Sequence, residues 1–165
     1  MKNEIRKKIP PIGIEDFSRM MGGNYYYVDK TLFIKELLDS LASVNVFLRP
    51  RRFGKTLALS TLKYFFEDTG DEMRNAANRA LFEPLKILQE DVGYAARMTS
   101  CPVVSLTLKS AKQLSLNDSL YELKSAVSSE FHRHLPIVEG HIGDSDKTKY
   151  SYLSSYESCK SDSAE

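Results

Sequence analysis

The 165-residue sequence contains no tryptophan, only two cysteines and no long apolar run. Cys101 and Cys159 are too few and too far apart for a disulfide scaffold or a zinc knuckle. A bilayer-spanning helix needs roughly 20 consecutive apolar residues, and none is present. Residues 1–8 are charged and lack the apolar stretch of a secretory signal. These absences predict a cytoplasmic protein without a membrane segment.

An excess of charge of one sign is also missing. Lys and Arg total 23 against 22 Asp and Glu, which gives a net charge of +1. This balance argues against a globally basic nucleic-acid binder, although it is compatible with a local basic patch. The composition is that of an ordinary globular domain, and a chain of this length can bury a sizeable core.

The sequence changes character once, near Gly140. The residues that follow are rich in Ser, Asp and Lys and poor in aliphatic side chains, and they end without a closing helix or strand signal. We therefore predict an N-terminal tail over residues 1–9 and a domain over residues 10–139. Residues 140–165 are expected to be a polar, weakly ordered segment at which a longer protein is truncated.

Helix-like and strand-like patterns alternate within residues 10–139. Residues 25–28 are β-prone, and Asp29 after them offers a helix N-cap. The apolar runs at 44–48 and 102–108 are typical of buried strands. This alternation predicts an α/β fold, with a parallel sheet covered by helices. Apolar residues at helical spacing predict helices over residues 31–41, 55–66 and 116–135. Residues 14–21, between two prolines and two glycines, and residues 71–81 are further helix candidates.

Residues 44–57 have the order of a phosphate-binding P-loop: an apolar run, a tight polar loop, Gly-Lys-Thr and an amphipathic helix. A helix N-terminus carries unpaired N–H groups and partial positive charge, so it attracts an anion. Gly54 lets the backbone approach phosphate oxygens because it has no Cβ. Lys55 can reach the β- and γ-phosphates, and the Thr56 hydroxyl can bind Mg²⁺.

The loop departs from the generic GxxxxGK[ST] motif at its first position, where Arg49 stands in place of glycine. Pro50 can supply the bend, because its φ is already fixed near −65°. Two other interpretations stay open. The basic residues could form an ordinary surface loop, or Arg51 and Arg52 could bind acidic side chains or nucleic-acid phosphates.

The loop RPRRFGKT and the LALSTLKYFFE that follows it closely resemble the AAA-ATPase-like family of large, mostly bacterial proteins. The resemblance extends to residues 12–17, 25–31, 81–82 and 101–110, and it covers most of residues 10–135. It implies an incomplete P-loop NTPase-type parallel sheet with flanking helices, and in this family an Arg at the first loop position is usual. In full-length members a nuclease-like domain of the PD-(D/E)XK type commonly follows.

The resemblance implies ATP and Mg²⁺ as ligands. By position, Gly54, Lys55 and Thr56 match the Walker A residues, with Thr56 as the metal ligand, while Phe53 and Leu57 would contribute backbone N–H groups. The full predicted nucleotide-binding set is Arg51, Arg52, Phe53, Gly54, Lys55, Thr56 and Leu57.

A second block shared with the family consists of Asp29, Lys30 and Thr31. Contact with the nucleotide base, packing against the P-loop and helix capping by Asp29 are all open roles for it.

The acidic residue with which a P-loop ATPase holds Mg²⁺ and orients water is missing. The apolar run at 103–108 is followed by Lys109 and Ser110 and not by an acid. In residues 87–91 the apolar run before the acids is too short to form a buried strand. In the resembling family this acid lies on a later strand, beyond residue 165. We therefore predict nucleotide binding without competent hydrolysis and assign no catalytic residue.

Two alternatives to nucleotide binding remain: a basic-loop module that binds nucleic acid, and an inactive truncated gene product. A sheet that stops before its next strand would also leave an apolar edge beside residues 44–48. The sequence therefore predicts self-association through an exposed sheet edge.

Overall fold

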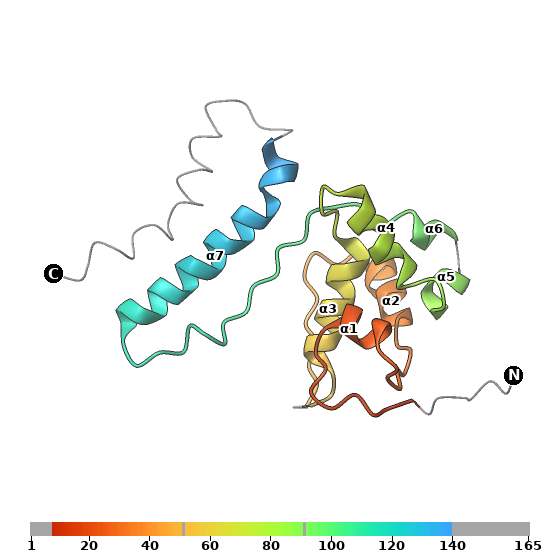
Figure 1. Ribbon diagram of the computed structural model, residues 1–165, viewed down its shortest axis with the longest axis horizontal. Helices are drawn as coiled ribbons and strands as arrows, with labels where there is room; N and C mark the ends of the chain where they lie inside the picture. Colours follow the sequence, from red (N-terminus) through yellow and green to blue (C-terminus); the bar gives the residue numbers. More distant parts are fainter. Residues whose placement is uncertain (1–7, 51, 91, 140–165) are drawn as a thin grey trace, which may run out of the picture. The chain divides into compact units, whose positions relative to one another are not determined.

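The computed structural model describes residues 8–50, 52–90 and 92–139. The chain divides into two compact units, Met1–Val103 and Val104–Glu165 (Figure 1). The first unit contains the helices α1 to α6, and the second contains α7. Their bounds are Phe17–Gly22 for α1, Leu32–Ser40 for α2, Lys55–Phe66 for α3, Glu72–Ala80 for α4, Lys86–Glu90 for α5, Val92–Ala95 for α6 and Leu116–Glu139 for α7.

The predicted parallel sheet is wrong, because the described ranges contain helices and irregular backbone but no β-strand. The runs at 44–48 and 102–108, expected to be buried strands, form no ladder there. Residues 25–28 form no strand either. Isolated parallel bridges join Ile9 to Tyr25 and Glu67 to Cys101.

The physical reason is that a strand depends on a partner for its backbone hydrogen bonds, and local β-propensity does not supply one. The apolar side chains of the first run are exposed instead: Val44 is 78% exposed, Val46 74% and Leu48 88%. No sheet edge therefore exists among the described residues, and the predicted self-association through such an edge is not tested by the structure.

The helices predicted from the sequence do form. The spans 31–41, 55–66 and 71–81 correspond to α2, α3 and α4, and the span 116–135 corresponds to α7, which continues to Glu139. The span 14–21 overlaps α1, which begins only at Phe17. The short helices α5 and α6 were not predicted.

Aspartate side chains define where two of these helices begin. Asp16 Oδ1 accepts a hydrogen bond from the Arg19 N–H at 2.9 Å, at the start of α1. Asp71 Oδ1 accepts from the N–H groups of Met73 and Arg74, at 2.9 and 3.4 Å, at the start of α4. Each carboxylate satisfies N–H groups that the helix itself leaves unpaired.

Aromatic side chains build the core of the first unit. The ring centroid of Phe82 lies 4.8 Å from that of Phe17 in α1 and 5.3 Å from that of Phe65 in α3. The N–H of Phe17 also donates to Ser60 Oγ at 2.9 Å. These contacts fix α3 against α1 and so set the direction in which its first turn points. The buried cluster consists of Phe17, Ile34, Phe65, Phe82, Leu85, Ile87 and Met98.

The second unit is described over an irregular segment and α7. Within it, Arg133 forms an ion pair with Glu130 at 2.7 Å, and Glu130 Oε2 accepts from the Ser105 N–H at 3.0 Å. The carboxylate thus ties the irregular segment to the helix. None of the helices in the described ranges combines the length and apolar character required to cross a membrane.

Candidate phosphate-binding loop and adjoining pocket

Irregular polar backbone at residues 49–50 and 52–54 precedes α3. Gly54 is the N-cap residue and has a φ of 73°, a left-handed conformation in which a residue with a Cβ would be strained. Arg52 is also left-handed, with a φ of 67°. No side chain caps α3, so its first-turn N–H groups have no side-chain acceptor, which is the arrangement that favours an anion at a helix start.

The Lys55 side chain folds back over this loop. Its Nζ donates a hydrogen bond to the Arg49 carbonyl oxygen at 2.6 Å, across six residues of sequence. In the described part of the chain the ammonium forms no salt bridge. A neutral carbonyl is a weaker partner for an ammonium than a phosphate oxygen, so a phosphate can replace it.

The two threonines of α3 differ in how their hydroxyls are used. Thr61 is buried, and its Oγ1 donates to the Leu57 carbonyl oxygen at 2.8 Å, as is common inside helices. Thr56 is exposed in the first turn, and its hydroxyl has no hydrogen-bond partner among the described residues. A hydroxyl oxygen in this position is a suitable ligand for Mg²⁺.

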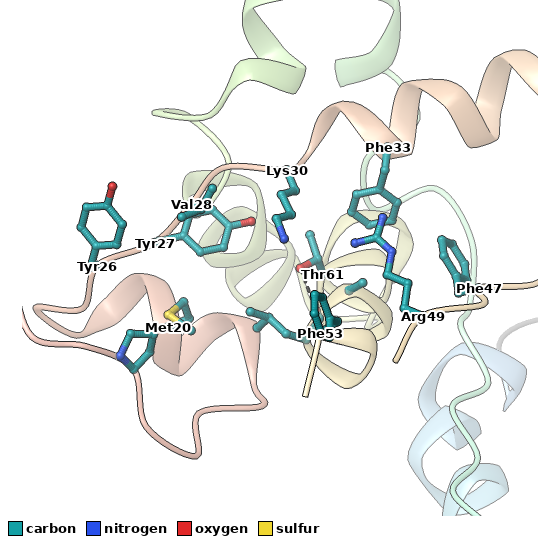
Figure 2. Close-up of a pocket in the computed structure, with 14 residues that line it drawn as sticks. Met20, Tyr26, Tyr27, Val28, Lys30, Phe33, Phe47, Arg49, Phe53 and Thr61 are labelled. Carbon is teal, nitrogen blue, oxygen red and sulfur yellow. Dashed lines mark hydrogen bonds between the residues drawn. The ribbon is translucent and has the colours of Figure 1, made fainter. Parts of the chain in front are cut away.

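A pocket of 210 Å³ lies beside the loop, along one face of α3 (Figure 2). Gly54, Leu57, Ala58 and Thr61 form its floor, at the i, i+3, i+4 and i+7 spacing that places residues on one helix face. Three of these four side chains are small, so the face is hollow. Aromatic residues complete the walls: Tyr26, Tyr27, Phe33, Phe47 and Phe53.

The pocket carries positive charge. Of the residues that the structure describes, Lys30 and Arg49 line it, and no carboxylate does. Neither cation is paired with a carboxylate of another described residue. Burial, followed by the charge of Asp29, raises the pKa of Tyr27 to about 12, so its hydroxyl is neutral at ordinary pH. The pocket is therefore suited to a ligand that combines an anionic part with an aromatic ring.

The residues of the block Asp29, Lys30 and Thr31 have two different roles, one in packing and one in the pocket. Asp29 Oδ1 accepts from the N–H and the hydroxyl of Thr31 at 2.8 and 2.7 Å, and Oδ2 accepts from the Lys86 N–H at 2.8 Å. The fully buried Thr31 Oγ1 accepts from the Ile87 N–H at 3.3 Å. Asp29 and Thr31 therefore join the start of α2 to the start of α5, and Lys30 between them lines the pocket.

These hydrogen bonds also change the acidity of Asp29. Burial raises its pKa, but hydrogen bonds from the Lys86 and Thr31 N–H groups and the Thr31 hydroxyl, with the Lys86 charge, outweigh it. The pKa is lowered below its ordinary value of 3.8. A carboxylate with a lowered native pKa stabilises the fold above its unfolded pKa, and this stabilisation is lost as the pH falls through the native pKa.

We expect Asp29→Asn to lower the free energy of unfolding at about pH 7 by about 1–3 kcal/mol, because the amide cannot accept at both oxygen positions. The difference from the wild type should be smaller at about pH 2.5 than at about pH 7, because this stabilisation is lost progressively as the pH falls through the lowered native pKa of Asp29. Urea unfolding at both pH values measures this. Glu83→Gln, an exposed substitution, is the control, and an equal Asp29→Asn loss at both pH values would contradict the assignment.

The structure brings most of the predicted site residues together at one end of α3. Phe53, Lys55 and Thr56 are exposed there beside Gly54, and Leu57 is partly buried in the pocket floor. Arg52 is exposed in the loop. Arg51 lies outside the described residues.

The predicted strand before the loop is absent, so the site consists of a loop and a helix. Sequence reasoning did not include most of the pocket walls in the predicted site, namely Tyr26, Tyr27, Phe33, Phe47 and the side chain of Arg49. The sequence contained one signal for the pocket. It is the block of Asp29, Lys30 and Thr31, for which contact with a nucleotide base is one of the open roles. Within the described ranges, no three His, Cys, Asp or Glu side chains come together as metal ligands.

Comparison with known proteins identifies a family whose model matches this chain. The family described as "Predicted AAA-ATPase" matches residues 11–161, which is most of the chain. The chain belongs to this AAA-ATPase-like family. Membership suggests nucleotide binding, with metal use, at a general level.

One relative is an uncharacterized protein in the vnfD 5′ region of Azotobacter chroococcum mcd 1. It is 44% identical over 84 residues, which is 50% of this chain and 14% of the relative. The chain therefore corresponds to a small part of that protein's length. No solved structure matches.

Proposed function

We propose that residues 49–56 form a Walker A-type loop that binds the terminal phosphates of ATP together with Mg²⁺. The observation that carries this proposal is the 2.6 Å hydrogen bond from Lys55 Nζ to the Arg49 carbonyl oxygen. It holds the ammonium over the loop that opens α3, where uncapped N–H groups attract an anion. AAA-ATPase-like family membership supports the same assignment.

Each residue of the loop has a distinct role in this proposal. The Gly54 backbone lets phosphate oxygens approach closely, and the N–H groups of Phe53 and Leu57 donate to them. Lys55 exchanges its carbonyl partner for the β- and γ-phosphates. The Thr56 hydroxyl is a ligand of Mg²⁺, and the metal, when bound, neutralises phosphate charge.

We further propose that this chain binds ATP without hydrolysing it at a competent rate. Phosphoryl transfer depends on positioned charge, including an acid that holds Mg²⁺ and orients the attacking water. The segment 103–108, the best candidate for the strand before such an acid, is irregular backbone and is followed by Lys109 and Ser110. The phosphate loop therefore has no acidic counterpart assigned in this sequence.

Titration of the full chain with a fluorescent ATP analogue tests this function. We expect saturable binding that needs Mg²⁺ and falls when EDTA is added, because the metal screens the phosphates beside Thr56. Phosphate release from ATP in the same samples should stay at the rate of the protein-free blank. Binding that is identical with EDTA, or phosphate release well above the blank, would contradict the proposal.

A short DNA duplex in the same assay distinguishes the basic-loop alternative. Binding to phosphates of nucleic acid falls steeply with salt, in proportion to the number of phosphates neutralised. Duplex binding that excludes the ATP analogue and is lost when Arg51 and Arg52 are both changed to Ala would favour a nucleic-acid module.

A further inference from the structure

We infer that Lys30 binds the phosphates of the nucleotide, as a cation that lies outside the Walker A-type loop. This inference rests on the proposed function, because it assumes that the phosphates lie at the start of α3. It gives a role to the middle residue of the block 29–31, whose two outer residues pack against the start of α5.

The carboxylate nearest to Lys30 in the sequence is already used by the fold. Asp29 Oδ1 accepts from the N–H and the hydroxyl of Thr31 at 2.8 and 2.7 Å, and Oδ2 accepts from the Lys86 N–H at 2.8 Å. The salt bridges among the described residues include none to Lys30. The ammonium is exposed and remains available to an anion from outside the protein.

The backbone around Lys30 is held in place although its side chain is exposed. The next residue, Thr31, is fully buried, and its Oγ1 accepts from the Ile87 N–H at 3.3 Å. The Tyr27 hydroxyl forms hydrogen bonds with the Lys30 backbone and with the Thr61 side chain. A side chain that is carried by such a fixed backbone loses less freedom when it binds a ligand, so the position suits a binding residue.

Lys30 and the phosphate loop border the same cavity. Both Lys30 and Gly54 line the 210 Å³ pocket. Figure 2 shows the Lys30 side chain extending toward α3 from the segment before α2, with Tyr27 and Arg49 on either side. A ligand at the start of α3 therefore has Lys55 on its own helix and Lys30 on another segment of the pocket wall.

The chemistry of the lining matches phosphate oxygens. The side chains of Lys30 and Arg49 offer hydrogen-bond donors only, and no carboxylate among the described lining residues competes for them. A phosphate oxygen is a charged acceptor, and an ammonium is a compact charge with three donors that can reach several such oxygens. Lys30 therefore adds positive charge to that of Lys55 at one ligand.

Lys30→Met tests this role, because it removes the ammonium and keeps an unbranched side chain. Lys30→Arg restores the charge. Lys63→Met is the matched control, since Lys63 lies in the last turn of α3 and does not line the pocket. Affinities for ATP and for inorganic tripolyphosphate, which has neither sugar nor base, are measured with Mg²⁺ by competition against the fluorescent ATP analogue.

We expect Lys30→Met to weaken ATP and tripolyphosphate by the same factor, roughly fivefold to tenfold, because the lost contact is to phosphates that both ligands have. Lys30→Arg should keep both affinities within roughly threefold of the wild type. Lys63→Met should bind both ligands as the wild type does. Binding of tripolyphosphate to Lys30→Met should also depend less on salt, since one charge that salt screens is gone.

Lys30→Gln, which is polar but uncharged, covers the case in which Lys30→Met fails to fold, and it should show the same loss. Unchanged affinity for both ligands would overturn the inference. A loss confined to ATP would also overturn it, because Lys30 would then contact the sugar or the base. An equal loss in Lys63→Met would reduce the effect to overall charge and reject the assignment.

Failure of this inference is distinct from failure of the proposed function. If the wild type binds neither ligand, or if Lys55→Ala binds both as the wild type does, the proposed function itself is wrong. Binding that depends on Lys55 and is unaffected by Lys30→Met rejects only the role of Lys30.

Discussion

Lys55→Ala should weaken ATP binding roughly tenfold to a hundredfold, the largest effect we expect on function. A hydrogen bond to a charged group contributes about 1.5–3 kcal/mol, and each 1.4 kcal/mol is a factor of ten in affinity. Lys55 is exposed, and its described hydrogen bond goes to the Arg49 carbonyl oxygen within its own loop. The change therefore removes a ligand contact without removing a core contact, and titration with the fluorescent ATP analogue measures it.

Lys63→Ala is the matched control, because Lys63 lies in the last turn of the same helix and does not line the pocket. It should bind the analogue with wild-type affinity. Circular dichroism of both variants checks that their helix content is retained. Equal affinity in the wild type and Lys55→Ala would remove the phosphate loop from the proposed function.

Phe82→Ala should give the largest loss of stability, about 3–5 kcal/mol. The side chain is fully buried, and it contacts the rings of Phe17 and Phe65. Truncation leaves a cavity among the helices that hold α3, and whole domains are stable by only about 5–15 kcal/mol. Urea unfolding followed by circular dichroism measures the change, and the variant should be partly unfolded without denaturant if the wild type is near the lower limit.

Met73→Ala is the control for this second experiment. Met73 is 83% exposed on α4, so its truncation should change the free energy of unfolding by less than about 0.5 kcal/mol. A Phe82→Ala protein as stable as Met73→Ala would mean that the aromatic cluster is not the core of the first unit.

Helices could be predicted from this sequence because their signals are local. The 3.6-residue apolar period of α3, for example, depends on neighbours within a few residues. The strands predicted at 44–48 and 102–108 do not form, and local sequence could not reveal this, because β-structure depends on a partner distant in sequence. An apolar run without such a partner leaves Val44 and Leu48 exposed.

The candidate site also has a part that the sequence predicts and a part that it does not. The loop and the helix start at Gly54, Lys55 and Thr56 are contiguous, so their spacing alone indicates a phosphate site. The pocket is assembled from Lys30, Phe47 and the Thr61 face of α3, which are separated by many residues. Their common location follows from packing, and periodicity within any one of these segments carries no information about it.

The sequence by itself determined the family and the helices α1 to α4 and α7, and it predicted a phosphate-binding loop, since all three depend on short contiguous patterns. Only the tertiary structure decided that there is no sheet in the described residues and that Asp29 and Thr31 join α2 to α5 while Lys30 faces a pocket. The reason is that such contacts join segments more than 50 residues apart, as in the hydrogen bonds from Lys86 to Asp29 and from Ile87 to Thr31. Whether such distant groups meet depends on the packing of the whole unit around Phe17, Phe65 and Phe82.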